Sequence, residues 1–202
     1  NYDFIHNYKN PLFIIGFVDY VLLYYNNVHK KIITINDYLE YLKKFMHRNI
    51  TIKKFKEALD ISKTKQIFIK PYGNIKKFTG CVIPSIKITY GWNKYVYMSN
   101  VVNFVSEFRF FIIDNKIRCS SYYSGNISII PNNNDIEEMV NLLKNNNEIE
   151  GGNYLIDVEV LENGETCFIE INHGFSFGMY SADINTCIEL MIKANFSFIS
   201  NL

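Results

Sequence analysis

The chain has 202 residues, of which 48% are hydrophobic, 16% aromatic and 20% charged. This balance excludes an intrinsically disordered chain and favours one packed core with, at most, a small appended lobe. The formal net charge of +1 excludes a global positive field, so we expect neither nucleic acid nor a membrane as a partner.

The N-terminal residues carry no pattern of a signal peptide. The chain opens at Asn1 rather than Met, so we expect a segment upstream of it. The apolar run PLFIIGFVDYVLLYY is interrupted by Gly16 and Asp19 and falls short of the roughly 18 to 20 apolar residues that cross a membrane. The cysteines are widely spaced and form no CxxC pair, which is typical of reduced thiols in an intracellular protein. We therefore expect a cytoplasmic location.

Residues 1–62 are expected to form a small, mostly helical N-terminal lobe. Asn36 can cap a helix over DYLEYLKKFMHR, in which apolar residues recur at helical spacing. Thr51 can cap a second helix over IKKFKEALDI. The second predicted region, residues 63–202, begins with the short strand QIFIK, which Pro71 stops.

The second region is mostly β after this strand. We predict further strands at KYVYMS, SEFRFFII, KIRCSSYY, NYLIDVEVL and TCFIEIN. Asp114 and Asn115 are expected to turn SEFRFFII back into KIRCSSYY. Helices are predicted at DIEEMVNLLK, capped by Asn134, and at ADINTCIELMIKA. This order indicates an α+β fold, an antiparallel sheet with helices on one face.

The last two predicted strands form a hairpin whose register can be assigned. The segment ENGE separates them, and Asn-Gly is a strong hairpin signal because both residues accept a positive φ. With Asn-Gly as a two-residue loop, Asp157 lies directly opposite Glu170. Asn172 lies on the same face as Glu170, because side chains two residues apart in a strand point the same way.

This register places two like charges side by side. Facing residues of a hairpin hold their Cβ atoms about 4.5 to 5.5 Å apart, and like charges at that spacing are destabilising. We therefore expect a cation, and Mg²⁺ prefers the carboxylate and amide oxygens that Asp157, Glu170 and Asn172 offer. The alternative is a solvated strand face that carries acidic residues and holds no metal.

Basic residues upstream suit phosphate. Lys70 ends an apolar strand, and the loop PYGNIKKFTG that follows carries Lys76 and Lys77 between glycines. In SEFRFFII, Glu107 and Arg109 share one face. The guanidinium of Arg109 either pairs with a carboxylate or clamps a phosphate, since its planar fork matches both. A solvated strand end is the alternative for Lys70.

An ordered set of segments resembles the ATP-grasp superfamily, and most closely a compact clade found in phages and large DNA viruses. The resemblance covers roughly residues 65–181. Its segments are IFIKP, KKFTG, SEFRFFIIDNKIRCSSYYSG, YLIDVEVLENGETCFIEIN and HGFSFGMY.

The resemblance implies an ATP-grasp fold and a role for each matching residue. Lys70 matches the lysine that reaches the ATP phosphates, and Lys77 matches the lysine of the lid loop, for which Lys76 is an alternative. Arg109 matches the arginine that stabilises the transferred phosphoryl group. The implied magnesium ligands are Asp157, Glu170 and Asn172, and the implied adenine hinge is residues 96–100.

The chain departs from the family pattern at one position. Many ATP-grasp ligases have an arginine two residues before the metal-binding aspartate, where this chain has Leu155. Arg109 would then carry more of the charge.

The implied function is an ATP- and Mg²⁺-dependent ligase that joins a carboxylate to an amine through an acyl phosphate. The partners would be a carboxylate substrate and an amine acceptor, each a small molecule or a polypeptide. Two alternatives stay open: a non-catalytic module that binds nucleotide or protein, and a kinase-type phosphotransferase with a hydroxyl acceptor. A viral protein would work in the host cytoplasm.

Overall fold

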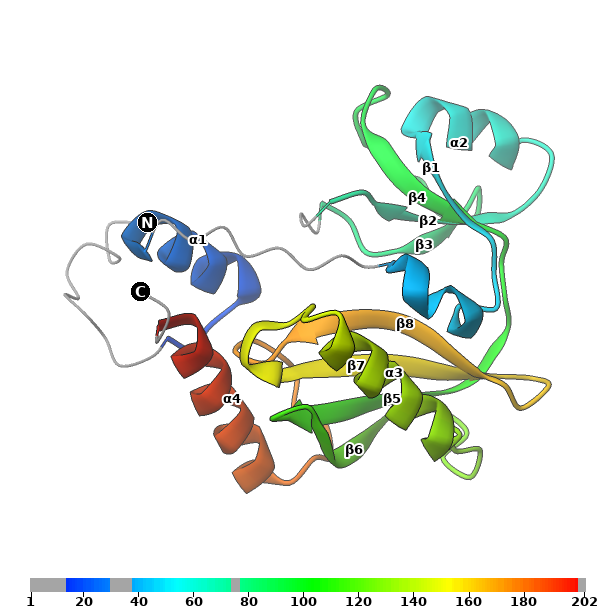
Figure 1. Cartoon of the computed structure of the whole chain (residues 1–202). Coiled ribbons are helices and arrows are strands. Elements are labelled where there is room, and N and C mark those ends of the chain that lie inside the picture. The colour runs from blue at the N-terminus through cyan, green and yellow to red at the C-terminus, as the bar shows by residue number, and fades with distance from the viewer. Residues whose placement is uncertain (1–13, 30–37, 74–76, 200–202) are drawn as a thin grey trace. The chain divides into compact units, whose positions relative to one another are not determined.

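The computed structural model describes three stretches of the chain, residues 14–29, 38–73 and 77–199. The chain divides into two compact units (Figure 1): the first is Asn1–Phe45 with Phe104–Leu202, and the second is Met46–Asn103. The predicted boundary between residues 62 and 63 falls inside the second unit.

The first unit is built on a four-stranded antiparallel sheet with the strand order β6-β5-β7-β8. The strands are β5 (Phe104–Ile113), β6 (Lys116–Gly125), β7 (Tyr154–Leu161) and β8 (Thr166–His173). Asp114 and Asn115 form the predicted turn between β5 and β6, with positive φ angles of 53° and 57°. The predicted α+β class with an antiparallel sheet is confirmed.

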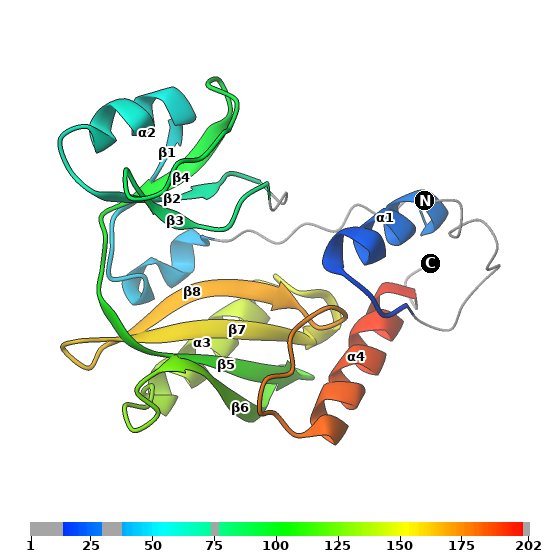
Figure 2. The same ribbon diagram turned by 180° about the vertical axis from the view of Figure 1, so that it is seen from behind.

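Helices cover both faces of this sheet. α3 (Asn133–Asn145) lies across one face (Figures 1 and 2), whereas α4 (Ile184–Ile199) packs on the other. Phe111 of β5 and Leu155 of β7 belong to one buried cluster with Cys187 and Leu190 of α4. Since side chains alternate along a strand, Arg109 lies on the face of Phe111. The arrangement extends the prediction, which had helices on one face only.

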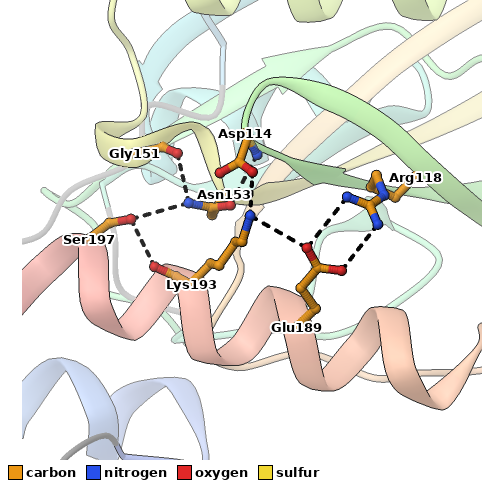
Figure 3. A network of polar contacts seen from close by, with 7 residues as sticks. All are labelled: Asp114, Arg118, Gly151, Asn153, Glu189, Lys193 and Ser197. Carbon is orange, nitrogen blue, oxygen red and sulfur yellow. Dashed lines mark hydrogen bonds and ion pairs between the residues drawn. The ribbon is translucent and has the colours of Figure 1, made fainter.

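Polar contacts anchor α4 to the β5–β6 hairpin (Figure 3). Lys193 of α4 pairs with Asp114 at the hairpin turn and, at 3.4 Å, with Glu189 one turn earlier. Glu189 in turn accepts a hydrogen bond of 3.2 Å from Arg118 of β6. The remaining helical elements of the first unit are α1 (Val18–His29), which packs against Ala194 of α4, and the short 3-10 helices η2 (Glu40–Phe45) and η3 (Glu150–Gly152).

The β7–β8 hairpin has the predicted register at its polar residues but a different loop. Asp157 faces Glu170 and Leu155 faces Asn172, as predicted. The loop has three residues rather than two, because Leu161 donates its backbone N–H to the carbonyl of Glu165. A bulge between Asp157 and Val158 shifts the register by one residue. The bulge offsets the extra loop residue, so both acids keep the face on which they were expected.

The cap of α3 lies two residues earlier than predicted. The side chain of Asn132, not Asn134, is the N-cap, and it accepts a 2.9 Å hydrogen bond from the backbone N–H of Asn134. We expect Asn132→Ala to lower the free energy of unfolding by about 1 kcal/mol, because one helix N–H loses its partner. Urea unfolding measures the change. Asn134→Ala is the matched control, and an equal loss in both variants would contradict the assignment.

The second unit is a smaller antiparallel sheet with the order β1-β4-β2-β3. Its strands are β1 (Ile50–Lys54), β2 (Ile67–Pro71), β3 (Cys81–Ile83) and β4 (Tyr95–Ser99), and its helix is α2 (Phe55–Ser62). Phe55 and Ala58 of α2 pack with Ile67, Ile69 and Val96 of the sheet in one buried cluster. The helix therefore covers the face of Ile69, and the next residue of β2 lies on the opposite face.

Two predicted helices of the N-terminal region differ in the structure. The helix over DYLEYLKKFMHR is only the six-residue η2, whose Leu42 and Phe45 are buried, and its predicted cap Asn36 lies outside the described residues. The helix capped by Thr51 is wrong at its start, because Ile50–Lys54 form β1 and α2 begins only at Phe55. β1 pairs with β4, a strand far along the chain, and this pairing outweighs the local helical pattern.

In the described part of the chain, no helix is both long enough and apolar enough to span a bilayer. The four cysteines, Cys81, Cys119, Cys167 and Cys187, are all free thiols.

Candidate functional site

The candidate site lies on the sheet of the first unit, where three neighbouring strands each contribute polar side chains. β5 supplies Arg109, β7 supplies Asp157, and β8 supplies Glu170 and Asn172. Arg109 is directly opposite Asp157, and Asp157 is directly opposite Glu170. The structure therefore brings together four of the six predicted site residues.

Arg109 and Asp157 form a buried, two-pronged ion pair. Nε of Arg109 donates to Oδ1 of Asp157 at 2.7 Å, and Nη2 donates to Oδ2 at 2.7 Å. The two side chains are only 10% and 8% exposed. Burial lowers the pKa of Arg109, but the hydrogen bond and charge of Asp157 outweigh it and raise that pKa above its usual value. The fork fixes the plane of the carboxylate as well as its position.

Asn172 links the two acids. Its side-chain N–H₂ group donates to Oδ2 of Asp157 at 2.8 Å and to Oε1 of Glu170 at 3.1 Å. Together with Arg109, this amide stabilises the facing carboxylates from within the protein. The inference that only a bound dication makes the facing acids tolerable is therefore wrong, although the same oxygens still suit a metal ion.

The loop after β8 covers Arg109, a contact that the sequence did not predict. Nη1 of Arg109 donates to the carbonyl of Gly178 at 3.2 Å, and its guanidinium lies 5.1 Å from the ring centre of Tyr180. Burial, followed by a hydrogen bond with Tyr123, raises the pKa of Tyr180 to about 12. The segment HGFSFGMY belonged to the predicted family resemblance, but its alternation and spacing carry no signal for this contact.

Glu107 is a further acid at the edge of this site, two residues before Arg109. Burial raises the pKa of Glu107, and the charge of Asp157 raises it further, although a hydrogen bond from Ser124 opposes the shift. A carboxyl whose folded-state pKa is raised stabilises the fold at low pH and loses that contribution as the pH rises through the folded pKa.

We therefore expect Glu107→Gln to raise the melting temperature at neutral pH, because a neutral amide replaces a partly desolvated charge. The gain should shrink on acidification, once the wild-type carboxyl is protonated. Thermal unfolding across a pH series measures the difference, with the exposed Glu162→Gln on the hairpin loop as control. A gain that is independent of pH would contradict the assignment to Glu107.

The predicted phosphate-binding lysines belong to the second unit. Lys70 lies on β2, and it is half-buried on the face of the sheet opposite α2. Lys77 is exposed in the connection between β2 and β3, and its alternative Lys76 lies outside the described residues. The predicted adenine hinge, residues 96–100, comprises most of β4 and the residue after it. The roles of these residues stay predictions.

The donor set of the site fits magnesium. Within residues 14–29, 38–73 and 77–199, no group of three or more His, Cys, Asp or Glu side chains could hold a metal. The site instead offers the carboxylates of Asp157 and Glu170 and the amide of Asn172, all within one hydrogen-bonded cluster. Mg²⁺ is usually bound by one or two carboxylates together with water and substrate phosphates, so this set is sufficient for it.

A family model describes the match of this chain to known sequences. Residues 45–190 match the model of an ATP-grasp domain, which is the second family of one clade of the superfamily. The matched segment includes all six predicted site residues, and it spans well over half of the chain. A search of curated proteins finds no match.

Solved structures with a similar fold are ATP-grasp enzymes. The macrocyclase MdnC from Microcystis aeruginosa MRC, bound to the precursor peptide MdnA, has a TM-score of 0.51 and 13% identity over 76% of this chain and 57% of its own. N5-carboxyaminoimidazole ribonucleotide synthetase from Thermotoga maritima has a TM-score of 0.48 and 17% identity over 81% and 49%. The chain thus spans only about half the length of these proteins. The predicted ATP-grasp fold is confirmed.

Proposed function

Because the chain belongs to the ATP-grasp domain family that its residues 45–190 match, we propose that it is an ATP- and Mg²⁺-dependent ligase that joins a carboxylate to an amine. The family supports a ligase in general terms, and the carbon–nitrogen bond and the acyl-phosphate route are our proposal. A cytoplasmic location and a viral source stay predictions.

The observation that carries the proposal is the cluster of Asp157, Glu170 and Asn172 on two paired strands. A bound Mg²⁺ ion would be held by these three side chains and would supply positive charge beside the phosphates of ATP. Glu170 and Asn172 are half-buried, so the cluster remains accessible from solvent while Asp157 is held in place by its buried pair.

Lys70 and Lys77 are proposed to neutralise the phosphates of ATP from the second unit. A lysine acts there as a point charge on a flexible stem, which suits an anion whose position changes during the reaction. Phosphoryl transfer asks little covalent chemistry of the protein, so catalysis by this chain would rest on positioning and on charge neutralisation.

The proposed reaction proceeds in two steps. An oxygen of the substrate carboxylate attacks the γ-phosphorus of ATP, the bond to the β,γ-bridging oxygen breaks, and ADP leaves. The amine then attacks the acyl carbon, loses a proton to solvent, and expels phosphate. The acid and the amine are each a small molecule or a polypeptide.

Trapping with hydroxylamine tests this reaction. Purified protein is incubated with ATP, Mg²⁺, hydroxylamine and a panel of amino acids and short peptides as carboxylates. We expect ADP and a hydroxamate to form together, and both to require Mg²⁺. ADP without hydroxamate on a hydroxyl acceptor would favour a kinase instead, and ATP binding without any ADP would favour a non-catalytic module.

A further inference from the structure

The guanidinium of Arg109 has a structural partner on every side. Nε and Nη2 donate to the two oxygens of Asp157, and Nη1 donates to the carbonyl of Gly178. The ring of Tyr180 lies over the guanidinium plane at 5.1 Å. The residue that family resemblance assigns to the transferred phosphoryl group is thus held by the protein itself.

The loop that carries Tyr180 is fixed on the neighbouring strand. The backbone N–H of Ser181 donates to Oγ of Ser121 on β6 at 3.0 Å. The ring of Tyr180 meets that of Tyr123 edge to face, with the centres 4.4 Å apart. Tyr180 also has a φ of 49°, which a residue with a side chain seldom adopts. Contacts on both sides therefore hold the ring over Arg109.

We propose that Arg109 is a positioning residue, which acts through Asp157 and does not contact the transferred phosphoryl group. It fixes the orientation of the Asp157 carboxylate toward the metal, and Tyr180 holds the guanidinium in place as a cover. The inference rests on the proposed function. To reach a phosphate, Arg109 would have to leave a buried pair and the cover above it, whereas as a positioning residue it keeps every contact described here.

The test measures how Mg²⁺ changes the affinity for AMPPNP, an ATP analogue that is not hydrolysed. Calorimetric titrations with and without Mg²⁺ are compared for wild type, Arg109→Lys, Tyr180→Ala and Tyr180→Phe. Arg109→Lys keeps the charge and removes the fork, so it isolates orientation from electrostatics. Arg118→Lys is the matched control, because this arginine pairs with Glu189 at the exposed edge of the sheet.

We expect Arg109→Lys to reduce the enhancement by Mg²⁺ about tenfold, as is typical when a partner of a metal-binding carboxylate is lost. Its affinity for AMPPNP without Mg²⁺ should stay within about twofold of wild type, since no phosphate contact is removed. Tyr180→Ala should show the same pattern, and Tyr180→Phe, which keeps the ring, should restore the wild-type enhancement. Tyr180 is 48% exposed, so its variants remain informative if Arg109→Lys does not fold.

Three outcomes would overturn the inference. A variant that weakens AMPPNP binding without Mg²⁺ and keeps the full enhancement would show that Arg109 contacts the phosphates. A full enhancement in both Arg109→Lys and Tyr180→Ala would show that neither acts on the metal site. In both cases a Mg²⁺-dependent wild type leaves the proposed function standing. A wild type whose AMPPNP affinity does not depend on Mg²⁺ overturns the proposed function as well.

Discussion

Arg109→Ala is expected to lower the free energy of unfolding by roughly 3 to 5 kcal/mol, the range found when one partner of a buried ion pair is removed. The loss is large because Asp157 is only 6% exposed and would keep its charge beside Glu170 without the guanidinium. Urea unfolding, followed by far-UV circular dichroism and extrapolated to zero denaturant, measures the change.

Two further variants show whether the cost comes from the isolated charge. Arg109→Ala combined with Asp157→Ala should recover part of the stability, because the unpaired carboxylate is gone. Arg118→Ala removes an arginine whose pair with Glu189 is 44% and 34% exposed, so it should cost at most about 1 kcal/mol. A loss of similar size for Arg109→Ala and Arg118→Ala would contradict the buried pair.

Glu170→Ala is expected to reduce ATP-dependent ligation by about two to three orders of magnitude, the loss typical of a group that stabilises the transition state. Glu170 is half-buried and faces Asp157, so removing it relieves repulsion between two acids and should leave the fold stable. Steady-state release of ADP at saturating Mg²⁺ measures the effect on turnover.

Glu165→Ala is the matched control for this variant. Glu165 is an exposed acid at the end of the same hairpin loop, and its variant should turn over ATP as the wild type does. Near-normal turnover by Glu170→Ala would remove this residue from the metal site, and a loss of folded structure would show that Glu170 is a structural residue instead.

The local features of the hairpin were predictable from the sequence. Asn-Gly between two alternating strands fixed which residues face each other, and Asp157 does lie opposite Glu170. The loop itself was wrong by one residue, and the register survived because a bulge beside Asp157 offset the difference. A bulge leaves no mark in the alternation of so short a strand, so the sequence could not reveal it.

The contacts of Arg109 were not predictable, because they depend on which strand lies beside β5. Alternation placed Arg109 on the face of Glu107, and both a carboxylate pair and a phosphate clamp were compatible with that pattern. The pairing of β5 with β7 brings Asp157 to Arg109 across 48 residues of sequence. The same holds for Tyr180, whose loop reaches β5 only after the sheet has formed.

The N-terminal errors have a similar physical origin. ITIKKFKEALDI contains apolar residues at helical spacing, yet its first residues pair with β4 and become β1. Its remainder keeps the predicted helix as α2. Local preference therefore decided the half that packs on the sheet as a helix, and pairing with a distant strand decided the other half.

The central claim is that Asp157, Glu170 and Asn172 form the magnesium site of an ATP-dependent enzyme. A crystal structure of the protein with AMPPNP and Mg²⁺ tests it most directly. The account predicts a metal ion about 2.0 to 2.1 Å from oxygens of these side chains and of the phosphates. A metal ion and nucleotide bound elsewhere, with Asn172 still donating to both acids, would contradict it.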